Sequence, residues 1–103
     1  MKMFDYKNIK PQIGNHCFCA DGSVIIGNCS IGDHVSIWFN TVLRGDIAKI
    51  EVGEGTNIQD LSILHITEGI NLAVGKFVTV GHNVTLHSCN IADFCLIGMG
   101  SII

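Results

Sequence analysis

The chain has 103 residues, enough for one domain, and a formal net charge of −3 at pH 7. Its Lys and Arg residues form no cluster, which argues against binding to nucleic acid or to an anionic membrane. No apolar run reaches the roughly 18 residues that span a bilayer, and the N-terminal segment lacks the apolar core of a signal peptide. We therefore expect a cytoplasmic protein with neither a membrane nor a nucleic-acid partner.

The composition favours strands, because Ile, Val and Gly are frequent while Ala and Leu are scarce. Five cysteines form an odd set without a CxxC pair, so we expect reduced thiols and no disulfide framework. Free cysteine packs as a small hydrophobe, and Cys29, Cys89 and Cys95 fall in an inward slot of the repeat described below. These three thiols are predicted to fill the core.

Residues 1–20 show mixed charge and no sustained period. They are predicted to form either an N-terminal arm or a degenerate first coil of the repeat that follows. The sequence leaves these two alternatives open.

Residues 21–103 repeat with a period of about six residues. A small or β-branched residue usually stands two positions before each aliphatic one. A six-residue unit with one inward aliphatic side chain cannot bury itself, but stacked units form a continuous core. Three units make a triangular coil of about 18 residues, and coils stack about 4.8 Å apart. The pattern predicts an all-β parallel β-helix whose inward aliphatic residues are Ile26, Ile31, Ile37, Leu43, Val52, Ile58, Leu64, Val74, Val80, Leu86, Ile91 and Ile97.

Two steps of the repeat are longer than six residues. Extra residues in such a coil bulge outward, so surface loops are predicted around residues 44–51 and 67–72. The second insertion sets the register of two histidines. Counting by threes places Leu64 and Leu86 in one column, so His65 and His87 become neighbours on consecutive coils.

His82 belongs to another face of the triangle, where the count places it over Asp60. A catalytic zinc site commonly has three protein ligands. One chain would supply His65 and His87, and a neighbouring subunit of a cyclic trimer could supply its own His82. The alternative is that all three histidines are ordinary polar surface residues. Geometry alone favours neither interpretation over the other.

Several motifs together carry a family resemblance over about residues 20–103. They are the RGD at Arg44–Asp46, the NIQD at Asn57–Asp60, the LH that ends at His65, and the segment VGHNVTLH that ends at His87. With them the sequence resembles gamma-class carbonic anhydrases and carbonic-anhydrase-like proteins, which are left-handed β-helix homotrimers with a metal at each subunit interface.

The resemblance implies a left-handed helix and a role for each motif residue. Zn²⁺, or else Fe²⁺ or Co²⁺, would be bound by His65, His82 and His87. Gln59 would hydrogen-bond the reacting water or bicarbonate, and Glu68 would be the proton shuttle. The remaining motif residues would be structural, with an intersubunit ion pair and a supporting carboxylate provided by Arg44, Asp46 and Asp60.

The reaction implied is reversible hydration of CO2 to bicarbonate by a metal-bound hydroxide, a lyase activity. Two alternatives stay open: a metal-binding trimer without enzymatic activity, and a hexapeptide-repeat acyltransferase. Glu68 is the only carboxylate of its loop, which favours the first alternative. Family members continue for further coils and a C-terminal helix, so the sequence is expected to be a C-terminally truncated member that lacks this helix.

Overall fold

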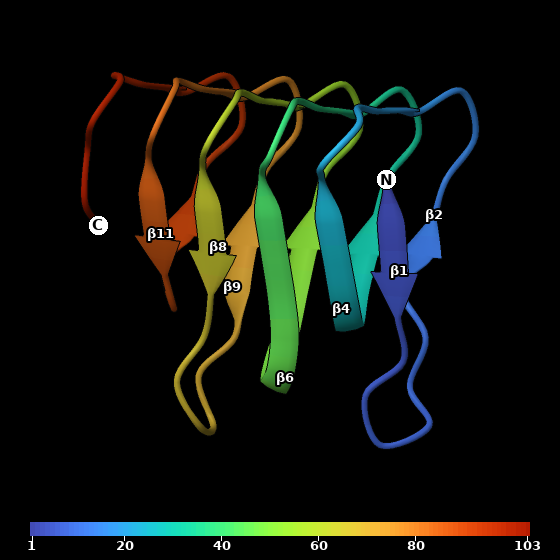
Figure 1. Cartoon of the computed structure of the whole chain (residues 1–103). Helices are drawn as coiled ribbons and strands as arrows, with labels where there is room; N and C mark the ends of the chain where they lie inside the picture. Colours follow the sequence, from blue (N-terminus) through green and yellow to red (C-terminus); the bar gives the residue numbers. More distant parts are fainter.

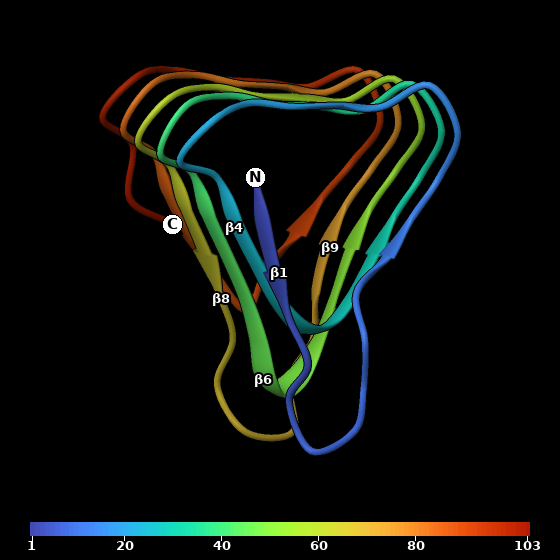
Figure 2. The same ribbon diagram turned by 45° about the vertical axis from the view of Figure 1, so that its right-hand side comes forward.

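The computed structural model describes all residues 1–103, and they form a parallel β-helix with no helix among its elements. Successive turns of the chain stack into a triangular prism (Figures 1 and 2). The predicted parallel β-helix is therefore confirmed. The thirteen strands are β1 (Lys2–Phe4), β2 (Gln12–Ile13), β3 (Phe18–Cys19), β4 (Val24–Ile31), β5 (Ser36–Ile37), β6 (Val42–Val52), β7 (Asn57–Ile58), β8 (Ile63–His65), β9 (Leu72–Val74), β10 (Thr79–Val80), β11 (Thr85–His87), β12 (Asn90–Ile91) and β13 (Leu96–Ile97).

The prism has three faces, each a ladder of parallel strands. One face is the ladder β3-β5-β7-β10-β13. The other two faces share β4 and β6, which run around one corner without a break. The first halves of β4 and β6 pair with β1 and β8, and β8 pairs with β11. Their second halves pair with β2 and β9, and β9 pairs with β12.

The core is a column of aliphatic side chains that point into the prism. It holds 17 buried residues, including Leu43, Leu64 and Leu86, which lie at paired positions on successive coils. The inward residue of β4 is Ile25, which is fully buried and pairs with Leu43, whereas Ile26 is only partly buried. The prediction of Ile26 was therefore off by one residue, and the step from Ile25 to Ile31 restores the six-residue period.

Residues 2–19 form the first coil of the prism. β1 and β2 pair in parallel with the two halves of β4, and β3 pairs with β5. A loop around the antiparallel bridge between Tyr6 and Ile9 projects from this coil (Figure 1). Of the two alternatives for this segment, the strand pairing favours the degenerate coil over the free arm.

The two insertions behave differently. Residues 44–51 do not form the predicted surface loop, because β6 continues through them as a strand. Gly27 pairs with Gly45 and Cys29 with Ile50, so the extra residues make a bulge at the corner opposite Asn28. The second insertion is a loop as predicted: residues 67–71 are exposed and project between β8 and β9 (Figure 1).

Two corners of the prism turn on residues with positive φ. One corner stacks His16, His34, Gly55, Phe77 and Phe94, whose φ values lie between 52° and 71°. A positive φ is uncommon for residues other than Gly, Asn, Asp and His. These residues adopt the left-handed conformation because the chain must reverse there to continue the ladder of the next face.

The chain has no helix whose length and apolar character would let it cross a membrane.

Candidate functional site

The paired histidines lie where the column count predicts them. β8 and β11 are in register, with Leu64 opposite Leu86 and His65 opposite His87. Both leucines are fully buried, so the alternation of a strand turns both histidines outward. The two ring centroids are 5.3 Å apart with an angle of 57° between the planes. Two imidazoles from consecutive coils are therefore brought together at the surface.

Asp46 holds one of these rings in place. Its Oδ2 accepts a hydrogen bond of 2.8 Å from Arg44, and its Oδ1 lies 3.0 Å from Nε2 of His65. Burial acts to raise the pKa of Asp46, but the hydrogen bond from His65 and the charge of Arg44 outweigh it and lower the pKa below its ordinary value. An ionised carboxylate beside one ring nitrogen fixes the orientation of the ring and leaves the other nitrogen available.

The RGD motif explains how Asp46 reaches this position. Gly45 packs against β4 so closely that a Cβ there would stand 2.6 Å from the carbonyl oxygen of Asn28. The glycine allows the two backbones to approach, while Arg44 and Asp46 project outward on either side of it. Within the chain, Nη1 of Arg44 lies 2.8 Å from Oδ2 of Asp46. The expected ion pair between subunits stays a prediction.

His82 lies on another face, as predicted, above Asp60. Its Nδ1 is 3.2 Å from Oδ1 of Asp60. Both residues line a pocket of about 200 Å³, together with Gln59, Trp38 and Asn57. The structure thus brings Gln59, Asp60 and His82 together, and it separates this group from the pair His65 and His87.

Glu68 lies exposed in the loop 67–71, and no hydrogen bond or ion pair joins it to the histidines. The loop is tied to the chain by Ser88, the residue after His87. The Ser88 hydroxyl accepts a hydrogen bond from the Thr67 amide and donates one to the Ile70 carbonyl. The loop that carries Glu68 is therefore anchored beside the histidine pair.

A metal ion would need donors from more than one chain. Within one chain, no three His, Cys, Asp or Glu side chains lie close enough together to hold a metal ion. The available donors are of the kind that binds zinc, since His65 and His82 each have one ring nitrogen beside a carboxylate and the other free. The donor set fits a metal if a second copy of the chain completes it. The assignments of His65, His82, His87, Gln59 and Glu68 stay predictions.

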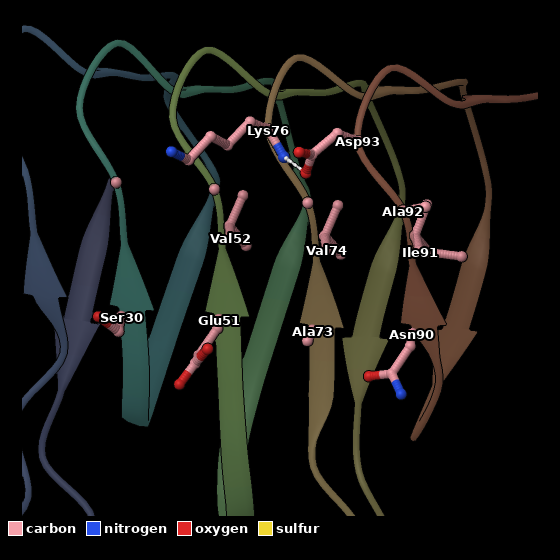
Figure 3. Close-up of a pocket in the computed structure, with 13 residues that line it drawn as sticks. Ser30, Glu51, Val52, Ala73, Val74, Lys76, Asn90, Ile91, Ala92 and Asp93 are labelled. Atoms are coloured by element: carbon pink, nitrogen blue, oxygen red, sulfur yellow. Dashed lines mark hydrogen bonds between the residues drawn. The ribbon is translucent and has the colours of Figure 1, made fainter.

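The largest depression lies elsewhere. It has a volume of about 630 Å³ and lies on the face formed by β4, β6, β9 and β12 (Figure 3). Its floor is made of glycines and aliphatic side chains, and its polar groups include Glu51, Asn90 and the hydrogen bond from the Lys76 amide to Asp93. It holds none of the histidines, so its size does not mark it as the reactive site.

Sequence reasoning missed two residues of the His82 pocket, Trp38 and Asn57. Trp38 is the only tryptophan and follows the inward Ile37, which places it outward. Asn57 is the first residue of the NIQD motif. Their positions could have been read from the repeat, because both stand on the same face as Gln59.

Comparisons with known proteins identify relatives of the chain. The family model for the bacterial transferase hexapeptide (six repeats) matches residues 10–45. A carbonic anhydrase of Geobacillus kaustophilus is 50% identical over 101 residues, which cover 98% of this chain and 56% of that protein. Gamma carbonic anhydrase 1, mitochondrial, of Arabidopsis thaliana is 40% identical over 108 residues, covering 98% of this chain and 38% of that protein.

A solved structure shares the fold. The hexapeptide transferase family protein of Anaplasma phagocytophilum superimposes with a TM-score of 0.93 at 46% identity, covering 98% of this chain and 59% of that one. The chain thus spans between 38% and 59% of the length of these three proteins. The matched segments extend over almost the whole chain. The chain therefore belongs to the hexapeptide-repeat family that contains the gamma carbonic anhydrases, as its motifs predict.

Proposed function

We propose that the protein is a gamma-type carbonic anhydrase that interconverts CO2 and bicarbonate at a metal site shared between subunits of a homotrimer. The observation that carries the proposal is the register of β8 and β11, which brings His65 and His87 together and leaves His82 on another face. In a cyclic trimer, one surface of each subunit contacts a different, complementary surface of the next subunit. His82 of one chain would then complete the pair of its neighbour.

A divalent ion held by three imidazoles would supply Lewis acidity that lowers the pKa of a water molecule toward about 7, as in carbonic anhydrases. The residues of the chain do the rest. Asp46 orients His65, and Asp60 orients His82 from 3.2 Å. Gln59, beside His82 in the same pocket, offers an amide to hydrogen-bond bicarbonate. Zinc is the proposed metal, and Fe²⁺ or Co²⁺ would suit the same imidazole ligands.

Each turnover of hydration must also release a proton. Glu68 is proposed to accept it, because Ser88 anchors the loop of Glu68 beside His87. Its carboxylate is exposed and can pass the proton to buffer.

The test is stopped-flow hydration of CO2 by the zinc-loaded protein, compared with His87→Ala. The proposal expects hydration well above the uncatalysed rate, lost in His87→Ala. A matched control is His34→Ala, because His34 is also exposed but lies at the corner where it stacks on His16. Equal background rates for the wild-type protein and His87→Ala would refute the proposal.

A second candidate is a metal-binding trimer without hydration activity, and the exposed Glu68 without a contact to any histidine favours it. It predicts bound metal in elemental analysis together with a background hydration rate. An acyltransferase on the same scaffold is a third candidate, since one relative is named as a hexapeptide transferase. Calorimetric titration with acetyl-CoA tests it, and absence of binding heat would exclude it.

A further inference from the structure

Three sulfur-bearing side chains, Met3, Cys17 and Cys19, lie on the inner side of the first coil. β1, β2 and β3 each pair with a strand on one side only, so their coil forms one end of the prism (Figure 1). Met3 pairs with Ile25, and Cys19 pairs with Ile37. Because Ile25 and Ile37 are fully buried, the register turns Met3 and Cys19 toward the inside of the prism as well. Cys17 stands two residues before Cys19 and therefore points the same way.

The two thiols are not simple filler of the core. On the same face, every later coil fills the position of Cys19 with a branched aliphatic side chain, namely Ile37, Ile58, Val80 and Ile97. A thiol is smaller than these side chains and buries less apolar surface. Cys17 and Cys19 pack against the core, yet both remain partly exposed, whereas Cys29 is buried. Solvent and dissolved ions therefore reach both thiols.

The two thiols are also close to each other and to the N-terminus. Burial is the main cause that raises the pKa of Cys19, the nearby Cys17 raises it further, and the amino group of Met1 lowers it. Such charge effects fall off with distance, so Cys17 and the amino group lie near the sulfur of Cys19. The Cys17 thiol donates a hydrogen bond of 3.1 Å to the Gly32 carbonyl, which fixes its orientation.

Two thiols and one thioether are a donor set that suits Cu(I), because soft sulfur ligands select this ion. Zn²⁺ normally takes four ligands from Cys, His, Asp and Glu, and no three such side chains lie close enough together in the chain. With metal–sulfur bonds of about 2.3 Å, as in zinc thiolates, one ion bridges sulfur atoms up to about 4.6 Å apart. Side chains two residues apart on a strand, with Cα atoms roughly 6.6 Å apart, can reach that separation.

We propose that Cys17, Cys19 and Met3 form a Cu(I) site at this end of the prism, with two thiolates and one thioether as ligands. On binding, each thiol gives its proton to solvent, so Cu(I) with two thiolates carries one negative charge. The amino group of Met1 near Cys19 offsets this charge. The inference does not depend on the proposed function, because β1 lies three ladder steps from β8, roughly 14 Å from the strand that carries His65.

Anaerobic titration with Cu(I) against a chromophoric chelator tests the site. The wild-type protein should withdraw one equivalent of Cu(I) from the chelator, and the double variant Cys17→Ser, Cys19→Ser should withdraw none. Cys89→Ser, Cys95→Ser is the matched control, because it removes two partly exposed thiols near the other end of the prism and should behave as the wild-type protein. No uptake by the wild-type protein, or equal uptake by both double variants, would overturn the proposal. Zn²⁺ binding that depends equally on Cys17 and Cys19 would overturn the choice of Cu(I).

The thioether is tested separately. Met3→Leu keeps an apolar side chain of similar size and removes the sulfur. Its Kd for Cu(I) should rise about 10- to 100-fold, the range found when even an outer partner of a metal ligand is lost. Met99→Leu is the control, since Met99 is 76% exposed on the last coil, and its Kd should equal the wild-type value. An unchanged Kd in Met3→Leu would overturn the three-sulfur site.

Alkylation of the native protein tests the site without any substitution, so it does not depend on the folding of a variant. One equivalent of Cu(I) should protect Cys17 and Cys19 from the alkylating reagent in mass spectrometry. Cys89 and Cys95 should keep the rates that they show without the ion. Unprotected Cys17 and Cys19, or equal protection of all four thiols, would overturn the proposal.

Discussion

Replacing Gly45 with alanine should destabilise the protein and disturb the histidine pair at once. The added Cβ would stand 2.6 Å from the Asn28 carbonyl oxygen and 3.0 Å from Sγ of Cys29. The nearest neighbour is backbone, so β4 and β6 must move apart. Overpacking of this kind lowers the free energy of unfolding by about 1–3 kcal/mol. For a domain of this size that corresponds to a fall in Tm of about 4–24 °C.

Thermal unfolding followed by far-UV circular dichroism measures this change. Gly98→Ala is the matched control, because the nearest atom to its added Cβ is the Ser101 Oγ at 4.0 Å, so its Tm should stay close to that of the wild-type protein. A shift of β6 would also move Asp46, and Gly45→Ala should therefore bind zinc more weakly. A Tm for Gly45→Ala equal to that of Gly98→Ala would refute the close-approach argument.

Three further predictions concern single side chains. Asp46→Asn should weaken zinc binding about 10- to 100-fold in a competition assay, because the carboxylate that orients His65 is lost, and unchanged affinity would contradict that role. Burial raises the pKa of Cys29 to about 11, so about one thiol in a thousand is ionised at pH 8. Mass spectrometry should therefore find Cys29 alkylated in urea but protected in the native protein. Equal alkylation rates in urea and in the native protein would contradict its burial. Leu64→Ala removes a fully buried side chain and should lower the free energy of unfolding by about 2–5 kcal/mol in a urea titration, whereas Leu61→Ala at an exposed corner should cost far less, and equal losses would contradict the inward column.

The sequence was sufficient to place the histidines because the repeat leaves little freedom. One inward aliphatic residue per six fixes which residue follows it on the outside, and an insertion only lengthens one coil. His65 and His87 are therefore in register although 22 residues separate them in the chain. His82 over Asp60 follows from the same count on another face.

The errors arose where the pattern has two equivalent solutions. Ile25 and Ile26 are both aliphatic, and only the pairing of Ile25 with Leu43 shows which one points inward. The insertion in residues 44–51 stays within one strand because both of its ends pair with neighbouring strands, which no count of residues reveals. Arg44 and Gly45 pair with β4, and Ile50 and Glu51 pair with β4 and β9, whereas residues 46–49 have no ladder partner.

Two buried polar atoms without a hydrogen-bond partner, Nε1 of Trp38 and Oδ1 of Asn57, lay beyond sequence reasoning for a different reason. Whether a donor finds an acceptor depends on distances between side chains of different coils. Ser36, which takes the Asn57 amide hydrogen, lies 21 residues earlier in the chain. The anchoring of the loop of Glu68 by Ser88 likewise joins residues about one coil apart.

Mixing two inactive variants tests the shared metal site most directly. His82→Ala keeps the pair His65 and His87, and the double variant His65→Ala, His87→Ala keeps His82. Each alone should be free of zinc in elemental analysis of the trimer fraction identified by light scattering. After random reassembly of equal amounts, about one quarter of the interfaces should regain a complete site, since one in four joins an intact pair to an intact His82. A mixture that stays without zinc, or single variants that retain the wild-type amount, would contradict a site shared between subunits.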